Sequence, residues 1–170
     1  MSGESAEYIP EDEMHGKKIN CFLENARLLR DRFGIIPLLY GSLGLEYRTG
    51  EDMGAEDIDI LVPRVFLTER WLEFKAALEM QGYLLVDEHE HTFVRDGVAY
   101  SYADLEDLES FAGIRAEDIT VYESESVRFM LLSLEQYLRV YQKSSRDGYR
   151  INVRQKKDTE KIRFIESQLQ

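Results

Sequence analysis

Two aspartates separated by one residue stand at the start of an apolar run, in Asp57-Ile58-Asp59-Ile60-Leu61-Val62. If this run is a strand, Asp57 and Asp59 leave it on the same face, while Ile58 and Ile60 enter the core. Two carboxylates held side by side repel each other. A divalent cation removes that repulsion, and carboxylate oxygens favour Mg²⁺ or Mn²⁺. The spacing therefore predicts a metal site at Asp57 and Asp59.

A glycine turn precedes the two aspartates. The apolar run at 35–40 predicts a buried strand, and Gly41-Ser42-Leu43-Gly44 predicts a tight exit from it. Gly41 lets the backbone approach a ligand closely, and the amides of Gly41 and Ser42 can point at phosphate oxygens. The Ser42 hydroxyl adds one more donor. A phosphate grip beside metal-binding carboxylates suits phosphoryl or nucleotidyl transfer.

Both motifs also have a purely structural interpretation. Asp57 and Asp59 could be a pair at a strand end that faces water, and Gly41-Ser42 could be an ordinary turn that caps a helix. The order of the two motifs, on successive strands of a mixed α and β chain, favours the functional interpretation.

The segment Leu39-Tyr40-Gly41-Ser42, followed by Asp57-Ile58-Asp59-Ile60, resembles the nucleotidyltransferase superfamily. This superfamily includes DNA polymerase β and the small bacterial aminoglycoside and lincosamide nucleotidyltransferases. The resemblance implies Mg²⁺-dependent transfer of a nucleoside monophosphate from a nucleoside triphosphate to a hydroxyl of a small molecule or protein. It covers residues 35–104 and, more loosely, the lysine-rich segment at 155–162. Fourteen residues separate Ser42 from Asp57, more than in the most compact members, and the surplus is a polar loop at 46–56.

The family also supplies a third carboxylate from a later strand, as a metal ligand or as the general base. Alternation along the strand expected at 98–103 places Val98, Tyr100, Tyr102, Asp104 and Glu106 on one face. Asp104, at the end of the strand, is the first choice for this catalytic and metal-binding role, and Glu106 is the second. Asp104 could instead cap the following helical turn.

Other residues with possible chemistry receive simpler interpretations. Lys143 is the first choice among the C-terminal basic residues to contact the triphosphate, and the others are expected on a solvated face. We expect His89 and His91 at the polar edge of a hairpin, because no third ligand lies near them in the sequence. Cys21 and Trp71 are expected in the core.

Composition limits the remaining classes of protein. The chain has 170 residues, of which 44% are hydrophobic, and we expect one domain over 1–170, with a loose lead-in at 1–9 and C-terminal helices at 133–170. A single cysteine excludes an internal disulfide and a cysteine-built zinc site. The net charge of −12 disfavours a dedicated nucleic-acid or membrane surface. An acidic N-terminus and the lack of a long apolar run lead us to expect a cytoplasmic protein.

Periodicity predicts an α+β fold, with a mixed sheet flanked by helices and a helical C-terminal segment. The expected strands are 35–40, 57–62, 83–86, 92–95, 98–103 and 119–122, and the expected helices are 11–33, 68–81, 133–145 and 154–168. Asp96-Gly97 predicts a hairpin, and Ser133-Leu134-Glu135-Gln136 predicts a capping box.

Two other functions are compatible with these motifs. A non-catalytic relative could bind nucleotide, or bind a partner protein as a toxin–antitoxin component does. A glycosyltransferase could hold a metal and a nucleotide sugar with Asp-x-Asp, although such domains need a larger sheet. The sequence leaves open whether the chain forms a homodimer.

Overall fold

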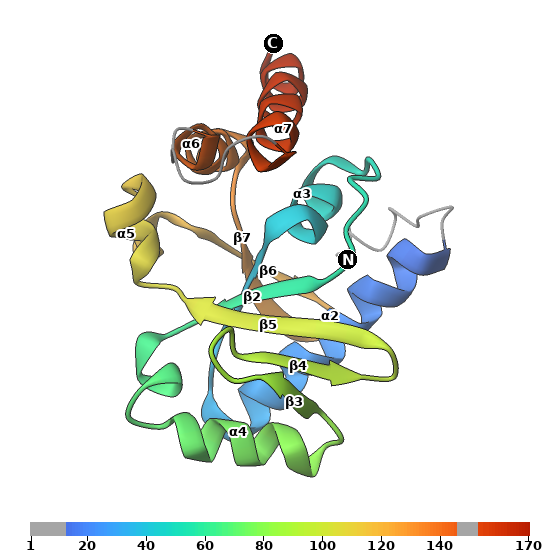
Figure 1. The fold of residues 1–170 in the computed structure, drawn as a ribbon, viewed down its shortest axis with the longest axis vertical. Coiled ribbons are helices and arrows are strands. Elements are labelled where there is room, and N and C mark those ends of the chain that lie inside the picture. Colours follow the sequence, from blue (N-terminus) through green and yellow to red (C-terminus); the bar gives the residue numbers. More distant parts are fainter. Residues whose placement is uncertain (1–12, 146–152) are drawn as a thin grey trace. The chain divides into compact units, whose positions relative to one another are not determined.

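The computed structural model describes residues 13–145 and 153–170 (Figure 1). The expected lead-in at 1–9 lies outside these residues. The described chain forms two compact units, one comprising the residues up to 105 together with 121–131, and the other comprising 106–120 and 132–170. The expectation of a single domain over 1–170 stays a prediction. None of the described helices combines the length and the apolar character that crossing a membrane requires.

Helices and strands are interspersed along the described chain. The strands are β1 Leu38–Tyr40, β2 Ile58–Val62, β3 Leu84–Asp87, β4 Thr92–Arg95, β5 Val98–Asp104, β6 Thr120–Ser124 and β7 Val127–Leu131. The α-helices are α2 Glu13–Phe33, α3 Gly41–Thr49, α4 Trp71–Met80, α5 Asp107–Ala112, α6 Leu134–Ser145 and α7 Val153–Leu169, and the 3₁₀ turns are η1 Arg64–Leu67 and η2 Ala116–Asp118.

One seven-stranded sheet organises the first unit, in the order β3-β4-β5-β2-β1-β7-β6. β2 is antiparallel to β1 on one side. On its other side it is parallel to β5, beside which it lies in Figure 1. Parallel pairing also joins β1 to β7. The predicted α+β class with a mixed sheet is therefore confirmed, and the strand that contains Asp59, with Asp57 directly before it, is central.

Aromatic side chains form the core on one face of this sheet. The ring of Phe74 from α4 meets Tyr102 of β5 edge-on at 5.2 Å, and it also packs against Phe33 of α2 at 5.7 Å. Ile58 and Ile60 of β2 are fully buried in the same cluster, as their predicted inward orientation requires. This face therefore anchors β2, and the alternate residues of β2 point away from it.

Several polar groups are buried within the same core. Asn25 is fully buried, and its amide lies beside the buried hydroxyls of Tyr83 and Tyr102. Arg95 packs over this group. Its guanidinium carbon lies 4.5 Å from the centre of the Tyr83 ring, and the guanidinium pairs with Glu24 at 2.7 Å. Buried polar groups need polar neighbours, and these side chains supply one another with them in the core.

The fold differs from the sequence-based expectation at α3, at β7 and at α5, which was not predicted. The segment 46–49, expected in a loop, completes α3, which ends at Gly50 in the left-handed conformation. Leu43 and Leu45 are buried, and their burial holds these residues in a helix. Strand β7 was not predicted at all. The turn before it uses Glu125 and Ser126, both with positive φ, in place of the glycine or asparagine that usually marks a hairpin.

Other local predictions are confirmed. Asp96 and Gly97 have φ values of 52° and 78°, as a type I′ hairpin turn requires. In the second unit, Ser133 and Gln136 form a reciprocal capping box at the start of α6. The Ser133 amide donates to Gln136 Oε1 at 2.9 Å, and the Gln136 amide donates to Ser133 Oγ at 3.1 Å. α6 and α7 then pack against each other.

Tyr102 gives the fold a pH dependence that can be measured. Burial raises the pKa of its hydroxyl well above the ordinary value. Above about pH 10 the unfolded chain releases this proton while the folded chain keeps it, so stability is lost as pH rises toward the folded pKa. We expect the free energy of unfolding to fall more steeply in the wild type than in Tyr102→Phe, by about 1.4 kcal/mol per pH unit. Urea denaturation on both sides of pH 10 measures both slopes, and equal slopes would contradict the assignment.

Candidate functional site

Gly41 and Asp59 are in direct contact at the end of β1. Gly41 has a φ of 67°, a backbone conformation that residues other than glycine rarely adopt. A methyl carbon placed on Gly41 would lie 3.2 Å from Cβ and Cγ of Asp59, and closer still to Oδ2. The residue is therefore bare because the Asp59 carboxylate occupies the space beside it. The sequence-based interpretation attributed the same requirement to a passing phosphate chain.

Strand register explains this contact. Asp59 of β2 is in register with Tyr40 of β1 on one side and with Ser101 of β5 on the other. Residues in register across a ladder share a face, so these side chains leave the sheet on the same side. Tyr40 is the last residue of β1, and Gly41 follows it directly as the first residue of α3. The register thus places Asp59 at the N-terminal end of α3.

The structure brings together the two motifs that the sequence singled out. Asp57 directly precedes β2 and is exposed, whereas Asp59 is half-buried. Ser42, also half-buried, is the second residue of α3. Backbone N–H groups at a helix N-terminus attract anions, so the start of α3 suits a phosphate group. Asp57, Asp59, Gly41 and Ser42 therefore form one continuous candidate site.

The donor set at this site suits magnesium. Mg²⁺ in proteins is commonly held by one or two carboxylates and completed by water and substrate phosphates. Asp57 and Asp59 supply two such carboxylates beside an anion-binding helix terminus. Within residues 13–145 and 153–170, no three His, Cys, Asp or Glu side chains gather closely enough to hold a metal by themselves. Two carboxylates would leave the other coordination positions of a Mg²⁺ ion to water or phosphate oxygens.

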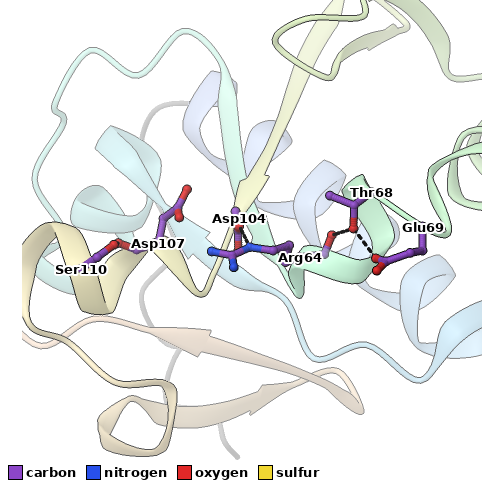
Figure 2. A network of polar contacts seen from close by, with 6 residues as sticks. All are labelled: Arg64, Thr68, Glu69, Asp104, Asp107 and Ser110. Atoms are coloured by element: carbon purple, nitrogen blue, oxygen red, sulfur yellow. Dashed lines mark hydrogen bonds and ion pairs between the residues drawn. The ribbon is translucent and has the colours of Figure 1, made fainter.

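Asp104, predicted as the third carboxylate, lies on the other face of the sheet. It is in register with Val62, three residues beyond Asp59, and strand alternation puts residues three apart on opposite faces. Its carboxylate pairs with the Arg64 guanidinium (Figure 2). The turn after Arg64 is closed by Thr68, whose hydroxyl donates to the Arg64 carbonyl at 3.0 Å. The structure thus does not bring Asp104 together with Asp57 and Asp59.

Sequence reasoning missed Ser101 as the neighbour of Asp59 on β5. The Ser101 hydroxyl is 2.8 Å from the Thr92 hydroxyl on β4, and both hydroxyls lie on the same face of the sheet as Asp59. The alternation along β5 was read correctly, but the series ending in Asp104 turned out to be the core face. The register with Ile58 and Ile60, which only the sheet order reveals, would have been the distinguishing signal.

The remaining candidates belong to the second unit or have structural roles. Lys143 is exposed near the end of α6, and Glu106 is exposed at the start of the second unit. Arg146 and Arg150 lie outside the described residues. In the hairpin between β3 and β4, His89 is exposed, and His91 packs edge-on against Trp71 at 4.8 Å. Cys21 is half-buried against the core, as predicted.

A comparison of sequences identifies the relatives of this chain. The uncharacterized protein YnaI of Bacillus subtilis (strain 168) is 40% identical to it over 149 residues, which represent 88% of this chain and 96% of YnaI. This chain belongs to the YnaI family. No protein-family model matches its sequence.

Solved structures show the fold that this YnaI-family chain shares. An antigenic nucleotidyltransferase-like protein from Paracoccidioides brasiliensis aligns with a TM-score of 0.63 and 16% identity, over 92% of this chain and 77% of that protein. The YnaI-family chain therefore has a nucleotidyltransferase-like fold, as the resemblance implied. The antibiotic-resistance factor ANT(2'')-Ia aligns less closely, with a TM-score of 0.47 and 16% identity over 86% of this chain and 85% of that protein.

The contact between Gly41 and Asp59 predicts the effect of adding one methyl group. In Gly41→Ala the new Cβ would displace the Asp59 carboxylate, and alanine would also be strained at a φ of 67°. We expect a folded protein of lower stability whose thermal response to Mg²⁺ is lost. Gly34→Ala is the matched control, because Gly34 between α2 and β1 also has a φ of 68° but no atom within 4 Å of an added Cβ. An equal Mg²⁺ response in the two variants would contradict the role assigned to Gly41.

Proposed function

We propose that this chain binds a nucleoside triphosphate with Mg²⁺ and transfers the nucleoside monophosphate to a hydroxyl of a small molecule or protein. The observation that supports the proposal most directly is the contact of the Asp59 carboxylate with Gly41 at the start of α3. This contact joins a cation-binding group to an anion-binding helix terminus, and a metal–triphosphate needs both.

Each residue of the site has a role in this proposal. Asp57 and Asp59 hold Mg²⁺ or Mn²⁺, and the amides at Gly41 and Ser42, with the Ser42 hydroxyl, bind phosphate oxygens. Lys143 is proposed to contact the triphosphate. When bound, the cation would neutralise charge on the phosphates, which is the main requirement of phosphoryl transfer. Asp57 and Asp59 would thereby act in catalysis as well as in binding.

The alternative is a protein of the same fold that binds the nucleotide, or a partner protein, without catalysis. The pairing of Asp104 with Arg64, on the core face, favours this alternative. Ser101 adds support, because the position on β5 that faces Asp59 has a hydroxyl in place of a carboxylate. A serine hydroxyl is a weak base at neutral pH and cannot replace a carboxylate in accepting the acceptor's proton.

The metal site can be tested through thermal stability. A cation that binds only the folded chain raises the melting temperature by mass action. We expect Mg²⁺ to raise it in the wild type, and Asp57→Asn combined with Asp59→Asn to abolish the gain. Asp52→Asn is the control, since Asp52 is an exposed carboxylate in the preceding loop. A Mg²⁺-induced shift that survives in the double variant would place the cation elsewhere.

Pyrophosphate release distinguishes the enzyme from the binding protein. If Asp104 is the base, as the sequence predicts and its place on the core face disfavours, Asp104→Asn should keep nucleotide binding and lower transfer by roughly 10²–10⁴, with Glu106→Gln as the second variant. If the chain is a non-catalytic binder, the wild type should bind Mg²⁺ and nucleotide without releasing pyrophosphate. Wild-type transfer in both Asp104→Asn and Glu106→Gln would eliminate both residues as the base.

A further inference from the structure

A buried carboxylate on α3 organises the loop between the two motifs. Glu46 is 2% exposed, and its Oε2 accepts hydrogen bonds from the backbone amides of Met53 at 2.9 Å and Ala55 at 3.0 Å. Charged acceptors make the stronger hydrogen bonds in proteins, and a buried carboxylate without them would be costly. The two amides therefore fix the loop at 50–57 to the side of α3.

The same loop is tied at further points. Lys18 of α2 donates to the carbonyl of Ala55, so this one residue is held from both sides. The Gly54 amide donates to Asp52 Oδ1 at 2.8 Å, which closes a local turn. The side chain of Ala55 packs against the core. A polar stretch that the sequence identified as surplus is thus a specifically bonded segment.

The position of Glu46 links this segment to the candidate site. Ser42 and Glu46 are four residues apart on α3 and so lie on one face of the helix. Ala55 lies two residues before Asp57. The chain from Gly41 to Asp59 therefore forms a loop closed by Asp59 against Gly41, and Glu46 ties the loop across its middle.

We propose that Glu46 is a positioning residue, which holds the loop at 50–57 so that Asp57 stays beside Asp59 when the cation binds. The inference rests on the proposed function for its ligand, and on the Glu46 hydrogen bonds for its mechanism. Asp57 is exposed and precedes β2, so pairing within the sheet does not restrain it as it restrains Asp59. The anchored loop supplies that restraint.

The experiment measures Mg²⁺ affinity in the presence of a non-hydrolysable nucleoside triphosphate. Removing the partner that orients a metal ligand typically lowers metal affinity by about 10–100-fold, and we expect a loss in this range for Glu46→Ala. Glu46→Gln keeps an acceptor oxygen and should recover most of the affinity. Glu51→Ala removes an exposed carboxylate from the same loop and is the control for charge. Equal affinities in Glu46→Ala and Glu51→Ala would overturn the proposal.

Hydrogen exchange gives a second readout that does not need a ligand. The amides of Met53 and Ala55 should exchange faster in Glu46→Ala than in the wild type, and the amide of Asp57 should follow them. Unchanged exchange at these amides would overturn the proposal even if the wild type bound no nucleotide. A different result is faster exchange in Glu46→Ala together with a wild type that binds no nucleotide. That result would confirm the Glu46 hydrogen bonds to the loop but reject both the proposed function and the role of Glu46 in positioning Asp57. If Glu46→Ala does not fold, Lys18→Met removes the other tie to Ala55 and should raise the same exchange rates.

Discussion

The register of β2 between β1 and β5 is the constraint on which the candidate site depends. Asp59 is opposite Tyr40, the last residue of β1, and the Asp59 carboxylate therefore contacts Gly41, where α3 begins. A shift of one residue would send Asp59 into the aromatic core and bring Ile58 or Ile60 out to water. The burial of these two isoleucines therefore stabilises the register that places the carboxylate. The burial of Ile58 and Ile60 and the position of Asp59 thus follow from the same alternation of side chains along β2. A change in register would alter both.

Three interactions converge on the short segment between Gly41 and Asp59. The glycine admits the carboxylate, α3 presents its N-terminal end, and Glu46 anchors the intervening loop. A helix start at Gly41-Ser42 and a pair of aspartates on one strand face were predicted from residue types, whereas the contact of Gly41 with the Asp59 carboxylate was not. The loop was treated as a polar surplus, because hydrogen bonds from a side chain to distant amides leave no periodic signal in a sequence.

The fold class, most elements and the inward orientation of Ile58 and Ile60 could be predicted from periodicity and turn residues. Asp104 shows where such reasoning stops. Alternation correctly grouped it with Tyr100 and Tyr102, but alternation alone does not say which face is the core. That choice depends on which strand pairs with β5 and in what register, and pairing partners distant in sequence are set by packing of the whole sheet. β7 was missed for a related reason, since its turn lacks glycine and asparagine and its strand pairs with β1, far away in the chain.

The late position of β7 in the chain has a consequence for synthesis. β1 is formed near residue 40, yet one of its two partners is made of residues 127–131. A nascent chain shorter than this has an open, apolar edge in what will become the middle of the sheet, and open edges recruit other strands. During synthesis, β1 therefore lacks one of its two partners until residues 127–131 have been made. Products of this chain that are truncated before β7 would expose the unpaired edge of β1, which can pair with strands of other chains.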